Sequence, residues 1–156
     1  MAKRILVPLD RSDTAEAVLP LVSDMARSSG ATVRLLHVSP IPKLQVSDHG
    51  RVVAYEDQEM ERLEASGQEH LRAAEAQLHG VPVETVVRFG DPVEEIVGEA
   101  EVFGADLIAL ATPRRTWLQR LFGSVPEVHV SRSLPAADRF PVGKRVREGT
   151  GSGRRT

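Results

Sequence analysis

The sequence predicts an α/β fold built on a doubly wound, mainly parallel sheet, with four clear strands and a weak or absent fifth. Short apolar segments alternate with longer segments in which apolar residues recur every three or four positions, the order expected of successive βα units. Glycine or proline separates most of these segments, as at the ends of strands and helices. The 156 residues are enough for one domain with a sizeable core.

The first expected strand is Lys3–Leu9, an apolar segment that ends at Asp10. A helix should follow, because Asp13 and Glu16 have the spacing of a capping box at its start. Its apolar stripe consists of Ala15, Val18, Leu19, Val22, Met25 and Ala26. Since Pro20 lies inside this stripe, we expect a kink or a late helix start there.

The second and third strands should be Ala31–Val38 and Val81–Phe89, with a long helix at about Ala54–His79 between them. The segment Ser39–His49 contains two prolines and is expected to be a loop. The inward positions of the long helix are expected to be Met60, Leu63, Leu71, Ala74 and Leu78.

The next helix should begin at Gly90-Asp91-Pro92 and end at Gly104. Residues Leu107–Ala111 are apolar without alternation, which predicts a fourth strand covered on both faces. Ser124 and Glu127 have the spacing of a capping box, so we expect a helix from Ser124 to about Ser133. From Leu134 to Thr156 we expect a weak edge strand or none.

The composition narrows the classes of function. A formal net charge of −2 gives no reason to expect binding to DNA or to a membrane. The absence of cysteine excludes disulfides and thiolate chemistry. The apolar run near the N-terminus is too short for a signal peptide, so a cytoplasmic location is expected. Basic residues dominate after Asp138, and we divide the chain into an α/β domain, 1–138, and a basic, partly disordered tail, 139–156. This tail is either solvated or in contact with an acidic partner.

The segment Ala105–Val125 is the best candidate for an anion site. It combines a buried strand, a loop with Arg114, Arg115 and Arg120, and the pair Gly123-Ser124 at a helix start. Free backbone N–H groups and the positive end of a helix dipole favour anions at such a position. In a parallel sheet this loop and Asp10 would lie at the carboxyl ends of neighbouring strands, where ligands collect.

Three segments together resemble the universal stress protein family. They are KRILVPLDRSDTAEAVLPLV, GDPVEEIVGEAEVFGADLIALAT and FGSVPE, and the resemblance covers about Lys3 to Val130. It implies a Rossmann-like, adenine nucleotide α-hydrolase-like fold whose members commonly form homodimers through the fifth strand. It also implies a regulatory domain that acts by binding rather than by turnover. Some members bind ATP, with Mg as a possible companion ion, and others do not.

The resemblance also implies a set of nucleotide-binding residues. Pro8, Leu9 and Asp10 would lie near the base and ribose, and Val38 would contact the adenine. Residues of the loop after the fourth strand would complete the site, with phosphates at the last three: Ala111, Thr112, Arg114, Gly123, Ser124 and Val125.

This loop departs from the pattern of the ATP-binding members. Ala111 and Arg114 stand where that pattern has glycine, and eight residues instead of nine separate Arg114 from Gly123. Pro113 removes an N–H donor, whereas the arginines add positive charge. Arg11, where the family often has glycine, could attract phosphate or obstruct access. Two interpretations therefore stay open: an adenine-nucleotide site, or a protein-interaction module without nucleotide.

Catalysis and metal binding find less support. Asp10 is either a ribose- or metal-contacting carboxylate, or a turn residue at a strand end or a helix cap. No general base is framed by a motif, so a slow ATP hydrolase is the least favoured hypothesis, and we expect no catalytic residues. The five histidines lack metal-ligand spacing and are expected to be hydrogen-bonded or exposed. Because the expected fifth strand is weak, we expect a weaker homodimer or a different interface.

Overall fold

The fold is described from a computed structural model of the chain. It describes residues 3–11, 13–42, 45–46, 52–54, 56–111, 120, 128–131 and 146–149. The elements in chain order are β1 (Arg4–Pro8), α1 (Asp13–Glu16), α2 (Leu19–Ser29), β2 (Thr32–Ser39), β3 (Gln45–Val46), β4 (Val52–Ala54), α3 (Glu56–Glu75), β5 (Val83–Phe89), α4 (Pro92–Phe103), β6 (Leu107–Leu110), β7 (Val128–Ser131) and β8 (Val146–Gly149).

Among the described residues, the main sheet has six strands in the order β5-β2-β1-β6-β7-β8, and every pairing in it is parallel. The four predicted strands are confirmed as β1, β2, β5 and β6. From β1 the chain builds the sheet outward through β2 to β5, and then returns to place β6 on the other side of β1. The strand order therefore reverses between β1 and β6.

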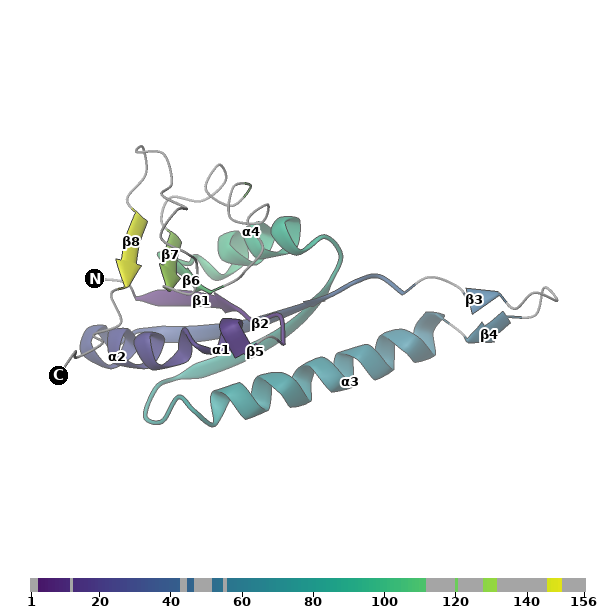
Figure 1. Cartoon of the computed structure of the whole chain (residues 1–156), viewed down its shortest axis with the longest axis horizontal. Coiled ribbons are helices and arrows are strands. Elements are labelled where there is room, and N and C mark those ends of the chain that lie inside the picture. Colours follow the sequence, from purple (N-terminus) through teal and green to yellow (C-terminus); the bar gives the residue numbers. More distant parts are fainter. Residues whose placement is uncertain are drawn as a thin grey trace.

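Helices cover both faces of the sheet, as the doubly wound fold requires. Figure 1 shows α1, α2 and α3 on one side and α4 on the other. Alternate residues of the central strands divide between two cores. Ile5 and Val33 pack with Val22 and Leu71 on the side of α2 and α3. On the opposite side, a second cluster around α4 consists of Leu6, Leu36, Val93, Ile96, Phe103, Ile108 and Leu110.

The first helical region is interrupted where Pro20 predicted a kink or a late start. It consists of α1 and α2, separated by a turn at Ala17 and Val18, and Pro20 lies in the first turn of α2. A proline is tolerated there because the N–H that it lacks has no partner within the helix. Gly30 ends α2 with a φ of 66°, a left-handed conformation that glycine adopts without strain.

The long helix is confirmed, but its first half extends beyond the sheet (Figure 1). Met60 and Leu63 were expected to point inward and are only half-buried, whereas Leu71 and Ala74 are fully buried. Part of the expected loop is also ordered: β3 pairs with β4 as a two-stranded antiparallel ribbon near the start of α3.

The helix expected from Ser124 to about Ser133 is wrong at Val128–Ser131, which forms the parallel strand β7 beside β6. Val128 and Val130 alternate with two polar residues, a period typical of a strand, and β-branched residues favour that conformation. The short edge strand β8 lies in the segment for which we expected a weak edge strand or none. The domain boundary between 138 and 139 stays a prediction. None of the described helices is long and apolar enough to cross a membrane.

Candidate functional site: the carboxyl edge between β1 and β6

The carboxyl ends of β1 and β6 lie at the same level of the sheet. Leu6 pairs with Ile108, and each strand ends two residues further on, at Pro8 and Leu110. The residues that follow, Leu9 and Asp10 on one strand and Ala111 on the other, therefore leave the sheet side by side. This edge is also where the strand order reverses, the usual position of a ligand crevice in an open α/β sheet.

Five of the ten predicted site residues are described, and all five lie at this edge. Pro8, Leu9 and Ala111 are buried, and Asp10 is partly exposed. Val38 is partly buried and lies two residues beyond Leu36, the partner of Pro8, so β2 extends past the end of β1. The edge thus combines an apolar floor with a partly accessible carboxylate.

The other five predicted residues lie outside the described part of the chain. They are Thr112, Arg114, Gly123, Ser124 and Val125. The phosphate half of the predicted site therefore stays a prediction, whereas the half assigned to the base and ribose has a defined structure.

The side chain of Arg11 points to helix α3. Its guanidinium Nη2 donates a hydrogen bond to Ser66 Oγ on α3, at 2.6 Å. The backbone of Arg11 has a φ of 67°, in the left-handed region. A residue with a side chain incurs a cost of about 1–2 kcal/mol there, whereas glycine incurs almost none. The loop after β1 is therefore strained, and a contact with α3 holds it.

Arg120 is the one arginine of the expected anion loop that the structure describes, and it contacts the start of α4. Its Nη1 and Nη2 donate to Asp91 Oδ2 and Oδ1, at 3.2 and 3.0 Å. Asp91 also caps α4 by accepting the N–H groups of Val93 and Glu94. The Arg120 guanidinium and these N–H groups hold the pKa of Asp91 below its usual range. Arg120 thus lies at the carboxyl side of the sheet, bound to an acid of the protein itself.

His37 lies directly below the loop after β1, a position that sequence reasoning did not single out as functional. Its ring is 6% exposed, and Nδ1 lies 3.0 Å from the carbonyl oxygen of Leu9. Because that oxygen can only accept, Nδ1 carries the proton. Burial lowers the pKa of His37, and the nearby Arg11 acts in the same direction against the bond to Leu9. The sequence could have indicated this position, because Val33, Leu35 and His37 lie on the same apolar face of the expected strand. A histidine buried on such a face needs a hydrogen-bond partner.

A second histidine packs against the first. The rings of His37 and His70 meet edge to face, with centroids 5.8 Å apart. His70 Nε2 is buried and has no hydrogen-bond partner among the described residues, so the expectation that each histidine is hydrogen-bonded or exposed is wrong for this atom. His70 Nδ1 lies 3.9 Å from Glu16 Oε1 on α1. The described residues include no group of three or more acids and histidines that could hold a metal ion.

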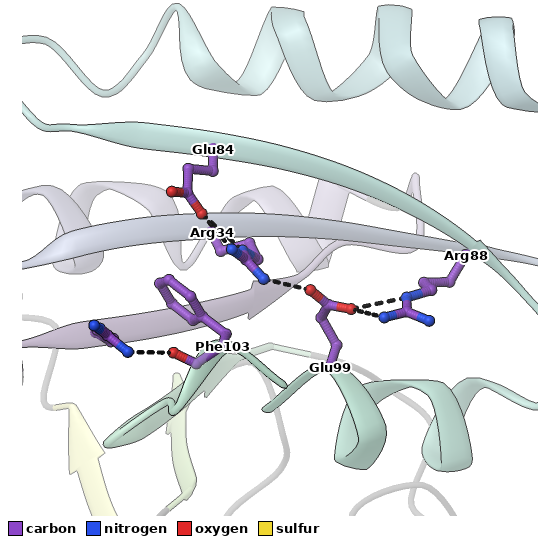
Figure 2. A network of polar contacts seen from close by, with 6 residues as sticks. Arg34, Glu84, Arg88, Glu99 and Phe103 are labelled. Carbon is purple, nitrogen blue, oxygen red and sulfur yellow. Dashed lines mark hydrogen bonds and ion pairs between the residues drawn. The ribbon is translucent and has the colours of Figure 1, made fainter. Parts of the chain in front are cut away.

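A charged cluster lies on the α4 face of the sheet. Figure 2 shows Glu99 between Arg34 and Arg88, with Phe103 beside the Arg34 guanidinium. Arg34 Nη1 donates to Glu99 Oε1 at 2.6 Å, and Arg88 Nε donates to Glu99 Oε2 at 2.8 Å. Arg34 also binds Glu84 through two further hydrogen bonds. The carboxylate of Glu99 is 2% exposed, so these arginines neutralise a buried charge and tie α4 to β2 and β5.

The comparisons with known proteins agree with this architecture. The model of the universal stress protein family matches residues 1–133. Universal stress protein MJ0531 of Methanocaldococcus jannaschii is 33% identical over 131 residues, which cover 80% of this chain and 74% of that protein.

Two similar solved structures contain nucleotides. A universal stress protein family protein from Arabidopsis thaliana with AMP bound has a TM-score of 0.62 at 17% identity, covering 82% of this chain and 90% of that one. The universal stress protein from Archaeoglobus fulgidus in complex with dAMP has a TM-score of 0.59 at 17% identity, covering 82% and 96%. The match of the family model over most of the chain, together with the fold, shows that the chain belongs to the universal stress protein family.

Proposed function

We propose that the protein binds an adenine nucleotide at the carboxyl edge between β1 and β6, and that it acts by binding and association rather than by turnover. The observation that carries this proposal is the reversal of strand order at that edge, with Asp10 on one side and Ala111 on the other. A nucleotide there would have an apolar floor for its base and a carboxylate for its ribose hydroxyls.

The described half of the site fits these roles. Val38 is partly exposed and offers apolar surface for adenine, and Asp10 is accessible enough to accept hydrogen bonds from a ribose. Gly123, Ser124 and Val125 are proposed to hold the phosphates, with Arg114 adding positive charge. The relatives with bound AMP and dAMP support an adenine nucleotide as the ligand class, and ATP, with Mg, is our first candidate.

A second candidate function is protein interaction without a nucleotide. The observation that favours it lies in the loop sequence, where Pro113 lacks a backbone N–H and Arg114 has a bulky side chain in place of the glycine of the ATP-binding pattern. A loop of this composition is less suited to surround a triphosphate than a glycine-rich one. The cytoplasmic location and the homodimer also stay predictions.

Thermal melting with and without nucleotide separates the two candidates. ATP with Mg, at about 100 times its dissociation constant, should add about 2.7 kcal/mol to the free energy of unfolding. A comparison of ATP with AMP tests the contacts with the phosphates, and a comparison of ATP with GTP tests the contacts with the base. No shift of the melting temperature with millimolar ATP or AMP would leave the interaction module as the function.

Two aspartates at opposite ends of the strands provide a matched pair of variants. Asp10→Asn should weaken the ATP-dependent shift, because the neutral amide accepts hydrogen bonds from the ribose less strongly than a carboxylate. Asp106→Asn changes an acid at the amino end of β6, far from the crevice, and should leave the shift unchanged at neutral pH. If ATP shifts the melting temperature of both variants equally, Asp10 does not contact the nucleotide.

A further inference from the structure

The strand β5 forms one edge of the main sheet, at the opposite side from β8. Among the described residues it pairs with β2 alone, in a continuous register along its full length. None of its seven residues is buried, whereas five of the eight residues of β2 are. It also lacks the lysine, the proline and the bulge by which edge strands commonly avoid pairing with other chains. The described structure therefore leaves this edge open to another strand.

Two hydrogen bonds determine which backbone groups of β5 point to the open side. The Val33 N–H donates to the Pro82 carbonyl, and the Gly90 N–H donates to the Ser39 carbonyl. Because alternate residues of a strand bind the same neighbour, the even-numbered residues of β5 bind β2. The odd-numbered residues direct both their N–H and their C=O groups to the open side: Val83, Thr85, Val87 and Phe89.

These backbone groups match those of a second β5 strand placed antiparallel. With a two-fold axis at Val86, Thr85 lies opposite Val87 of the second copy, and Val83 lies opposite Phe89. Both pairs consist of outward-pointing residues, so in each pair the two residues exchange N–H···O bonds. The open edge can therefore satisfy its backbone groups with a second copy of itself.

The same register brings opposite charges together. Glu84 lies opposite Arg88 of the second copy, in a pair without backbone hydrogen bonds, where the Cα atoms are only about 4.5 Å apart. A slip of two residues would put Val86 opposite one of the charges, and a slip of four would put like charges opposite each other. Opposite charges across a strand pair stabilise it and like charges destabilise it, so the charges select this register.

Both charged side chains keep a group for the partner. Figure 2 shows Glu84 and Arg88 on β5, each bound to a neighbour within the chain. Arg34 donates only to Oε2 of Glu84, and Glu99 binds Arg88 at Nε and Nη2. The two side chains of β5 are 50% and 39% exposed. Among the described contacts, Oε1 of Glu84 and Nη1 of Arg88 therefore remain available to a second copy.

The helices on the two faces of the sheet are compatible with this pairing. Gly67 on α3 lies close to His37 on β2 and to Val87 on β5, so α3 lies over the groove between these strands. In the pair of copies, the two α3 helices would be about 10 Å apart, the spacing of packed helices. The helix α4 packs mainly over the more central strands of the other face.

We propose that β5 is the edge at which a second copy of this chain docks, with the two strands antiparallel about an axis at Val86. The sheet then continues through both copies. The edge lies across the sheet from β7 and β8, so this interface differs from the fifth-strand interface that the family resemblance implies. Since β2 separates β5 from the crevice at β1 and β6, the proposal does not depend on a nucleotide.

Cysteine cross-linking tests the register, because the chain itself contains no cysteine. Val86→Cys places two thiols opposite each other, at a separation that a disulfide can span. Mild oxidation should therefore convert most of this variant to a covalent dimer. Glu84→Cys and Arg88→Cys should give no covalent dimer singly, because equal positions would lie about 14 Å apart. When these two variants are mixed, they should cross-link to each other.

Val102→Cys is the control for random collision, because Val102 is 72% exposed on α4. It should cross-link far more slowly than Val86→Cys. No covalent dimer of Val86→Cys, or equal cross-linking of all variants whether alone or mixed, would overturn the proposal.

Sedimentation velocity, from micromolar to millimolar concentration without nucleotide, tests the pairing of the unmodified chain, which should form dimers. Thr85→Pro removes an outward N–H, a change that an edge strand tolerates. It deletes two backbone hydrogen bonds per dimer and should raise the dissociation constant of the dimer about tenfold or more. Thr85→Ala also loses the side-chain bond to Gln68 but keeps the N–H, so it should form dimers like the wild type.

Circular dichroism shows whether each variant is folded. A wild-type chain that stays monomeric over the whole range would overturn the proposal. A dimer that a folded Thr85→Pro variant leaves intact would also overturn it, because the contact would then lie at another surface. If Thr85→Pro does not fold, the cross-linking of Val86→Cys decides.

Discussion

At the scale of single residues, the loop after β1 shows how one side chain can keep a strained backbone in place. Arg11 has a left-handed φ where glycine would be unstrained, and its contact with Ser66 connects the loop to α3. The backbone strain lowers the free energy of unfolding and the hydrogen bond raises it. A single measurement of stability therefore does not reveal either contribution.

Comparing two substitutions of Arg11 separates these contributions. Arg11→Gly and Arg11→Ala both remove the bond to Ser66, but only glycine relieves the backbone strain. We expect Arg11→Gly to be more stable than Arg11→Ala by about 1 kcal/mol, because glycine's greater freedom in the unfolded chain offsets part of the relief. Urea denaturation gives the difference, and equal stabilities would contradict the strain.

At the scale of elements, α3 and α4 lie against the sheet through contacts of different kinds. The helix α3 lies close to β2 and β5 at Gly67, where His37 and Val87 leave no space for a side chain. The helix α4 is tied to the sheet by apolar contacts and by the buried carboxylate of Glu99.

Two glycines within helices give a matched test of this packing. Gly98→Ala in α4 meets no atom within 4 Å, and it should stabilise the protein by about 0.5–1 kcal/mol through its better helix propensity. Gly67→Ala brings a methyl group to 2.9 Å from His37 Cδ2, and it should lower the free energy of unfolding of the protein by about 1–3 kcal/mol. Thermal unfolding of both variants shows the opposite signs. A stabilising Gly67→Ala would mean that α3 is free to shift.

Two glutamates of the cluster on the α4 face should also differ in their contributions. Glu99→Ala removes a carboxylate that is 2% exposed and leaves Arg34 and Arg88 without it, at a cost of about 3 kcal/mol. Glu84→Ala removes a carboxylate that is 50% exposed, and its cost should stay below about 1 kcal/mol. Chemical denaturation measures both, and similar losses would show that burial does not set the contribution of this pair.

At the scale of the whole molecule, the acid sensitivity of the fold should depend on the amino edge of the sheet. Asp106 accepts the N–H groups of Lys3 and Arg4, at 2.7 and 2.9 Å, and these bonds lower the pKa of Asp106. The unfolded chain therefore binds a proton at Asp106 more readily, so the stabilisation is complete above the usual aspartate range and is lost as the pH falls through the folded pKa. Asp91 contributes in the same sense.

Removing one of these titrations should flatten the acid limb of the stability curve. Asp106→Asn can still accept a hydrogen bond at its amide oxygen but does not titrate. Between pH 5 and pH 2 we expect the wild type to lose more unfolding free energy than Asp106→Asn does. Urea unfolding at a series of pH values gives both curves, and parallel curves would assign acid sensitivity to other groups.

Much of this fold could be predicted, because local patterns determine most of its elements. The apolar runs around Ile5 and Ile108 and the helix ends at Gly30 and Gly104 are properties of short segments. Strand β7 was missed because Ser124 and Glu127 resemble a helix start, whereas its conformation depends on pairing with β6. The pairing of β3 with β4 likewise joins segments that carry no common local signal.

The candidate site divides in the same way. The alternation of elements predicted a parallel sheet, and Asp10 could be placed beside the segment after the fourth strand on the condition that the first and fourth strands are neighbours. The structure confirms that condition, because β1 pairs with β6. The contacts of Arg11 with Ser66 and of His37 with Leu9 could not be predicted, because each depends on how α3 and β2 pass beneath the loop. Tertiary packing, rather than local sequence, therefore determines the details of this loop.

The position of β1 at the centre of the sheet has a consequence for synthesis of the chain on the ribosome. One neighbour, β2, follows closely in the sequence, but the other, β6, is made about 100 residues later, and the Lys3 amide meets Asp106 across the same interval. At usual translation rates this delay lasts about 5–20 s. During that time the apolar strand Ile5–Val7 has an unpaired side open to other chains. The strand at the centre of the finished sheet is an unpaired edge during most of the synthesis of the chain, and protection of the nascent chain matters most in that interval.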